Sequence, residues 1–117
     1  MKVRITDELT QQIVDSARAV VGWNINFIDR HGRIMASTDS GRIGTYHKAG
    51  HVAARTGQVQ TVQEDRLEDG VSRGVNYPII MDHQVLGVIG ITGDSAVVGQ
   101  YGFLLTKFVK SSSRNTA

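Results

Sequence analysis

The segment Val85-Leu86-Gly87-Val88-Ile89-Gly90-Ile91-Thr92 decides the fold of this sequence. It is apolar at odd and even positions alike, so a strand formed by it needs cover on both faces. A second apolar segment, residues 77–81, precedes it, and Asp82-His83-Gln84 between them indicates a tight connection. The two segments therefore predict an antiparallel hairpin whose last strand is central in a sheet.

A second hairpin is predicted nearer the start of the chain. Residues 23–29 alternate in polarity, with Asn24 and Asn26 on the face opposite the apolar side chains. Residues 29–32 suit a type I turn, because Asp comes first and Gly last. Residues 33–38 then return as the second strand. The polar segment 58–73 has no clear assignment beyond a short edge strand around residues 59–62.

Three helices are predicted to flank the sheet. The first follows Thr6, a good N-cap, and ends at Gly22, which suits a left-handed C-cap. The second covers residues 46–55, and the third begins at Asp94 or Ser95. The third helix should face the sheet with the apolar stripe Val97, Tyr101, Leu104 and Phe108. The predicted order of helix, hairpin, helix, hairpin, helix gives an α+β fold with a small antiparallel sheet.

Composition narrows the class of protein. The 117 residues are 40% hydrophobic and 21% charged, which is typical of one globular domain. We place that domain at residues 1–110 and expect 111–117 to be a disordered tail, in a fragment of a longer protein. The chain has no cysteine, which excludes disulfides and thiolate metal sites. A formal charge of +2 disfavours nucleic acid as a direct partner, and no secretory leader or membrane-spanning segment is expected.

The sequence carries no motif typical of catalysis. Nucleophile-elbow, phosphate-loop and dinucleotide fingerprints are absent from the sequence, so we expect no enzyme and no cofactor. His47 and His51 have the i, i+4 spacing of a zinc-binding pair, but Lys48 follows where a metallopeptidase carries its glutamate. A zinc enzyme remains an alternative, and our prediction is no metal.

A recognition signal is clearer. Arg42-Ile43-Gly44-Thr45-Tyr46-His47 places a guanidinium, a glycine, a hydroxyl and an imidazole where a helix begins. Arginine binds carboxylates bidentately, and a helix start attracts anions. The segments 74–79 and 90–93 add Asn76 and Thr92, next to a glycine that leaves space at the end of the last strand. These residues predict an anion site between the sheet and the middle helix.

Taken in order, four motifs resemble the sugar-diacid recognition domain found at the N-terminus of bacterial carbohydrate-diacid regulators. They are residues 24–29, 42–47, 74–79 and 87–93, and the likeness extends over nearly the whole chain. The resemblance implies a PAS-like sensor fold in a cytoplasmic transcriptional regulator. It implies a ligand of glucarate, galactarate or glycerate type, and DNA binding through a helix-turn-helix domain not present here.

The resemblance also implies a set of ligand-binding residues. Arg42 and His47 would bind one carboxylate with nearby amides, and Asn76, Thr92 and the Gly93 amide would meet hydroxyls or the other carboxylate. The full set is Ser37, Arg42, Ile43, Gly44, Thr45, His47, Asn76, Thr92 and Gly93. A positive charge on His47 would strengthen binding as the pH falls from 8 to 6. The alternative is a ligand-free PAS-like module that forms a homodimer through its first and last helices.

Overall fold

The computed structural model describes residues 5–114 and has the α+β architecture that the sequence predicts. Three α-helices and two short 3-10 helices accompany five strands. The helices are α1 (Asp7–Val21), η1 (Ser40–Arg42), α2 (Lys48–Thr56), η2 (Leu67–Asp69) and α3 (Ser95–Arg114). The strands are β1 (Ile25–Ile28), β2 (Ile34–Ser37), β3 (Gln60–Val62), β4 (Gly74–Met81) and β5 (Gln84–Thr92).

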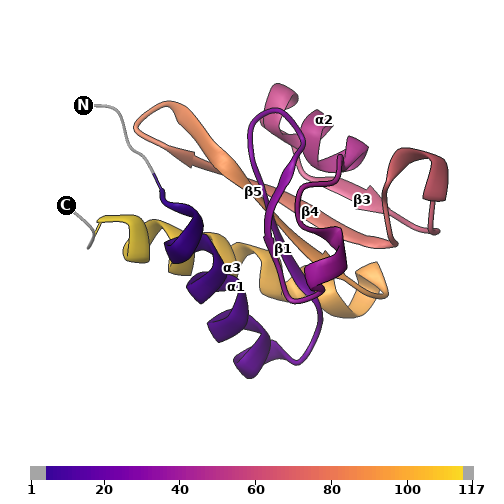
Figure 1. The fold of residues 1–117 in the computed structure, drawn as a ribbon, viewed down its shortest axis with the longest axis horizontal. Helices are drawn as coiled ribbons and strands as arrows, with labels where there is room; N and C mark the ends of the chain where they lie inside the picture. The colour runs from indigo at the N-terminus through magenta and orange to yellow at the C-terminus, as the bar shows by residue number, and fades with distance from the viewer. Residues whose placement is uncertain (1–4, 115–117) are drawn as a thin grey trace.

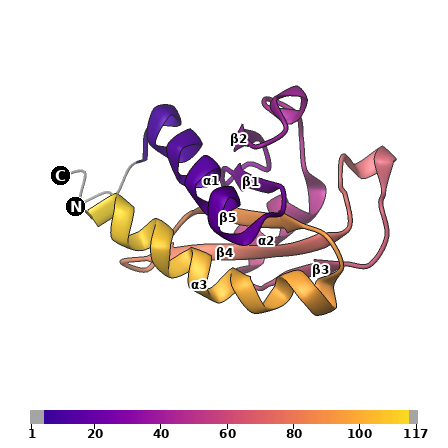
Figure 2. The same cartoon turned by 90° about the horizontal axis from the view of Figure 1, so that it is seen from below.

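The five strands form one antiparallel sheet in the order β2-β1-β5-β4-β3 (Figure 1). The apolar strand β5 is therefore central, as predicted, and the edge strand expected near residues 59–62 is β3. Helices α1 and α3 cover one face, and α2 covers the other over β3, β4 and β5 (Figure 2). The doubly apolar sequence of β5 is explained by this three-layer arrangement.

Unequal hydrophobic layers lie on the two sides of the sheet. The large layer under α1 and α3 includes Ile13, Phe27, Ile89 and Val98, all at most 2% exposed. Within residues 5–114, the small apolar cluster under α2 has five buried members: Ile28, Ile34, Ala53, Ala54 and Val88. The apolar contact between α2 and the sheet is thus short, and polar groups occupy the rest of that face.

Local signals fix the ends of these elements. The Thr6 hydroxyl accepts a hydrogen bond from Leu9 N at 3.1 Å, and Gly22 ends α1 with φ of 81°. The β4–β5 turn is tighter than the sequence indicated, because Gln84 already belongs to β5. Its two central residues, Asp82 and His83, have φ of 53° and 63°, the left-handed conformation that a two-residue hairpin requires.

Helix α3 differs from the prediction in which side it buries. Val98, Leu105 and Val109 face the sheet, whereas Leu104 is 60% and Phe108 41% exposed. Two apolar rows with helical spacing run along this helix, and the sheet takes the row one residue later than the one we expected. Tyr101 of the predicted stripe does pack against the core.

The C-terminal helix is also longer than expected. It continues to Arg114, so residues 111–114, which we placed in a disordered tail, belong to a helix. Residues 115–117 of that predicted tail lie outside the described residues. Within residues 5–114, no helix combines the length and the apolar composition needed to span a bilayer.

Candidate functional site

A row of polar residues crosses the face of the sheet that α2 covers. Strand pairing places Ser37, Asn26, Gly90, Asn76 and Gln60 side by side, one from each strand. Ser37, Asn26 and Asn76 are each only 3% exposed. A buried row of this kind is costly unless each polar atom has a partner, so its hydrogen bonds indicate what the row is for.

The internal hydrogen bonds satisfy only part of this row. The Ser37 hydroxyl donates to Asn26 Oδ1 at 2.6 Å, and Asn76 Nδ2 donates to the Gln60 carbonyl at 3.3 Å. Among residues 5–114, Asn26 Nδ2 and Asn76 Oδ1 have no further hydrogen-bond partner. A buried polar group without a partner costs about 1–3 kcal/mol, and a polar ligand that supplies the partner removes this cost.

Gly90 makes room for the Asn76 amide at the centre of the row. A Cβ at this position would lie 2.8 Å from Asn76 Oδ1 and 3.9 Å from the Cβ of Asn26. Since real Cβ atoms essentially never approach an atom to 2.8 Å, any other residue would displace the Asn76 amide. The glycine that the sequence marked as a missing side chain therefore lies between the two asparagines.

His47 stands at the start of α2 and acts as its N-cap. Its Nδ1 accepts a hydrogen bond from Gly50 N at 2.9 Å, so in the neutral ring the proton is on Nε2. The ring is 3% exposed, and Nε2 has no acceptor within the described part of the chain. His47 thus presents one buried N–H donor at the start of α2.

Burial, and to a lesser extent the nearby Arg42 guanidinium, lowers the pKa of His47 to about 4. The imidazole is therefore neutral at pH 6–8, which contradicts the second positive charge that we expected from this residue. His47 contributes a hydrogen-bond donor, and the charge near the site comes from Arg42.

Arg42 ends η1 and lies half-buried above the start of α2. Its Nη2 donates to the Gly70 carbonyl at 2.8 Å, which ties the loop after β2 to the loop after β3. Desolvation lowers the pKa of Arg42, while Asp39 and Asp65 oppose this effect. The pKa of an arginine is ordinarily so high that the group keeps its charge despite this shift.

The backbone amides that we expected to bind an anion are already used. Gly44 N donates to Ile34 O at 2.8 Å, Thr45 N donates to Arg42 O at 3.1 Å, and Gly93 N donates to Arg73 O at 3.0 Å. These bonds hold the loops in place, so the roles predicted for these amides are not supported. Ile43, another residue of the predicted ligand set, is 44% exposed.

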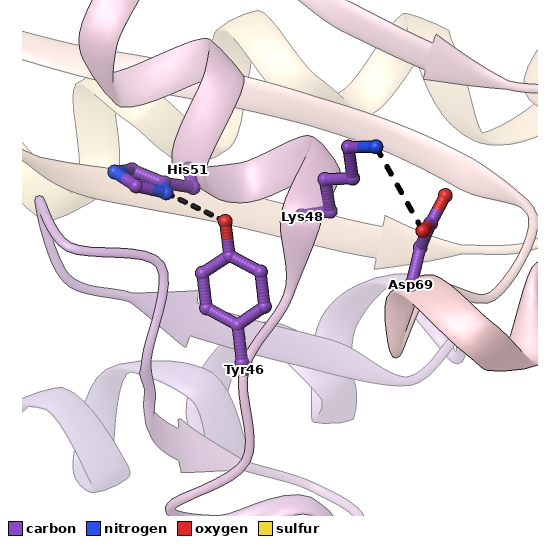
Figure 3. Close-up of polar contacts among 4 residues, drawn as sticks. All are labelled: Tyr46, Lys48, His51 and Asp69. Atoms are coloured by element: carbon purple, nitrogen blue, oxygen red, sulfur yellow. Dashed lines mark hydrogen bonds and ion pairs between the residues drawn. The ribbon is translucent and has the colours of Figure 1, made fainter.

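Two further contacts flank the start of α2 (Figure 3). The Tyr46 hydroxyl lies 2.6 Å from His51 Nδ1, and Lys48 Nζ lies 3.9 Å from Asp69 Oδ1. His47 and His51 therefore use their Nδ1 atoms in separate contacts. No group of three metal-ligating side chains forms within residues 5–114.

The structure places the predicted residues as follows. Ser37 and Asn76 are buried in the polar row, His47 is buried at the start of α2 with Arg42 near it, and Thr92 is half-buried at the end of β5. Asn26 was not in that set, although its place opposite the apolar side chains of residues 23–29 was a usable signal. Gln60 was missed because its strand had no clear pattern.

The whole of the described chain matches one family model. The family is described as "Putative sugar diacid recognition", and the match covers residues 5–115. The chain belongs to this family. The carbohydrate diacid regulator of Escherichia coli K12 is 33% identical over 100 residues, which cover 84% of this chain and 26% of the regulator. The chain thus spans about a quarter of the length of that relative.

Solved structures confirm the PAS-like sensor architecture expected from the resemblance. The sensor domain of the Vibrio cholerae histidine kinase DctB matches with a TM-score of 0.59 at 24% identity, over 80% of this chain and 40% of that one. A GAF domain from an Acinetobacter phosphoenolpyruvate-protein phosphotransferase matches with a TM-score of 0.63 at 10% identity, over 93% of this chain and 82% of that one. This is a sugar diacid recognition domain with the fold of sensor domains.

Proposed function

We propose that this chain is the ligand-sensing part of a cytoplasmic transcriptional regulator and that it binds a small sugar diacid or hydroxy acid. The family description and the name of the E. coli relative support a sugar diacid, and the ligand that we propose is of the glucarate, galactarate or glycerate type. In this proposal the domain has no catalytic role, needs no metal or cofactor, and passes its signal to a DNA-binding domain elsewhere in the protein.

The observation that carries this proposal is a set of buried polar atoms that have no partner within residues 5–114. His47 Nε2 and Asn26 Nδ2 are donors, and Asn76 Oδ1 is an acceptor. A hydroxylated acid offers both carboxylate acceptors and hydroxyl donors, so it could satisfy all three. Arg42 would supply the charge for one carboxylate, and the Thr92 hydroxyl lies one row further along β5.

A thermal-shift panel of glucarate, galactarate, glycerate, tartrate and citrate tests this function. A ligand present at a hundred times its Kd should add about 2.7 kcal/mol to the free energy of unfolding, which for a domain of this size is a shift in Tm of about 10 °C. The absence of any shift across the panel would contradict the proposal.

Arg42→Ala should remove most of the binding measured by calorimetry, because a charge-assisted hydrogen bond contributes about 1.5–3 kcal/mol. Arg42→Lys keeps the charge and loses the planar guanidinium. Its diacid affinity should therefore lie between those of wild type and Arg42→Ala. Arg55→Ala is the matched control, since Arg55 is exposed at the far end of α2. Equal affinity in Arg42→Ala and wild type would exclude the guanidinium from the site.

A homodimerisation module remains the second candidate, and one observation favours it. A groove of about 400 Å³ lies between α1 and α3, and its lining includes Val20, Leu104 and Phe108. Val20 is 82% exposed. The same apolar surface on two copies can pair about a two-fold axis. A dimer that forms in the absence of diacids and a Tm that no diacid changes would favour this function.

A further inference from the structure

A cleft, separate from the groove between α1 and α3, lies beside α2 toward the edge strand β3. It encloses about 130 Å³ between α2, β3 and the loop that carries η2. Lys48 and Arg66 supply positive charge to its wall, Gln60 and Thr61 supply polar groups, and Val52 and Val62 are among its apolar residues. None of these residues belongs to the ligand set that the sequence predicted.

The cleft offers an anion two cationic side chains and two backbone amides. Arg66 is exposed, and its guanidinium has no partner among residues 5–114. Lys48 contacts only Asp69, at 3.9 Å, which is long for a charge-assisted hydrogen bond (Figure 3). The first-turn amides of Lys48 and Ala49 also have no acceptor within the described chain, and both residues line the cleft.

We infer that this cleft binds the second carboxylate of the diacid, with Lys48 and Arg66 as its cationic residues. This inference rests on the proposed function. Arg42, which we assign to the first carboxylate, contacts Gly70, the residue after Asp69 of the cleft wall, so each end of the ligand meets its own positive charge. Because two separated charges must both be matched, the domain prefers a diacid to a monoacid of equal length.

The size of the cleft supports its role as a site for one end of the ligand. Pockets that enclose a whole small molecule measure about 300–1,000 Å³, and this cleft is well below that range. Gln60 connects it to the polar row, because Gln60 lines the cleft while its carbonyl accepts from buried Asn76. The cleft and the polar row therefore meet at Gln60.

Asp69 occupies the place of the ligand carboxylate in the free protein. It also lines the cleft, and its side chain, 23% exposed, faces Lys48. A bound carboxylate takes over Lys48 from Asp69. Removing the Asp69 charge should then strengthen diacid binding, a direction of change that loss of a structural contact alone would not produce.

Calorimetry on the 117-residue chain with glucarate and gluconate tests this inference, since gluconate has the same carbon chain with one carboxylate replaced by a hydroxymethyl group. Wild type should bind glucarate about tenfold to a hundredfold more tightly than gluconate, the effect of one charge-assisted contact. Lys48→Gln and Arg66→Gln should reduce this preference toward onefold, with gluconate affinity unchanged. Asp69→Asn should raise glucarate affinity severalfold.

Arg55→Gln is the control, because it removes one positive charge from an exposed position at the other end of the same helix. Its preference for glucarate should equal that of wild type. If Lys48→Gln and Arg66→Gln keep the wild-type preference, the second carboxylate site is wrong while the proposed function stands. If wild type binds neither glucarate nor any other diacid, both are wrong.

Discussion

Gly90 is the residue on which the arrangement at the centre of the polar row depends. A methyl group there would press against Oδ1 of Asn76, a short side chain that is only 3% exposed. We therefore expect Gly90→Ala to fold, since one amide can shift, and to lose at least tenfold in diacid affinity by calorimetry.

Asn76→Ala provides the control for this prediction, because it removes the group that the new methyl would displace. The two substitutions should be strongly non-additive, with a coupling free energy of unfolding of about 1 kcal/mol or more in a double-mutant cycle. Additive effects would show that Gly90 and Asn76 act independently, and the row would then lose its central feature.

His47 should make the stability of the domain depend on pH. Its pKa is lowered from 6.5 to about 4 in the folded chain, so the unfolded state binds a proton first as the pH falls. The stability contributed by the neutral ring is complete above pH 6.5 and is lost progressively toward pH 4, by a total of about 3 kcal/mol.

His47→Asn should keep the N-cap, since asparagine is a strong capping residue, and should lack this loss. Urea unfolding of both proteins at pH 7, 6, 5 and 4 measures the difference, and the other three histidines cancel because both proteins contain them. Parallel stability curves would contradict the lowered pKa.

At the scale of elements, α3 carries two glycines with opposite consequences. A Cβ at Gly99 would make ordinary contacts, the nearest at 3.7 Å from the Tyr77 hydroxyl, whereas a Cβ at Gly102 would overlap the Tyr77 ring at 1.7 Å from Cε2. Gly99→Ala should therefore stabilise the domain by up to about 1 kcal/mol through helix propensity.

Gly102→Ala should destabilise it by about 2 kcal/mol or more, because the aromatic ring must move out of a packed layer. Thermal unfolding of the two variants measures both effects on the same helix. If both alanines stabilise, Tyr77 does not pack against α3 as described.

The elements that the sequence predicted well are those with local signals. Thr6, Gly22 and the apolar run of β5 each mark an element through their own chemistry, and the structure confirms all three. Helix α3 lacks such a signal for its buried side, because the row of Leu104 and the row of Leu105 both have helical spacing. Only the position of the sheet decides between them.

The candidate site was predictable to a similar extent. Arg42, His47 and Asn76 were identifiable by residue type and by their place at the ends of elements. The row that joins Asn26 to Asn76 across Gly90 depends on the register of β1 against β5, two strands distant in sequence, and no local pattern specifies that register.

At the scale of the whole molecule, the two faces of the sheet have different tasks. The face under α2 carries polar groups and the cleft, whereas the face under α1 and α3 carries the large apolar layer, and an apolar groove lies between the two helices. Stable monomers seldom expose large apolar patches, so this groove favours contact with a second copy of the chain.

Sedimentation velocity over a hundredfold concentration range measures that contact. We expect wild type to form a dimer with increasing concentration, and the double variant Val20→Gln, Leu104→Gln to stay monomeric, because both side chains lie in the groove and are 82% and 60% exposed. Leu67→Gln is the matched control, since Leu67 is 89% exposed on η2, outside the groove. A dimer weakened equally by the control and the double variant would place the interface elsewhere. Since the groove lies on the face opposite the polar row, diacid affinity should be the same in all three proteins at concentrations where wild type is monomeric.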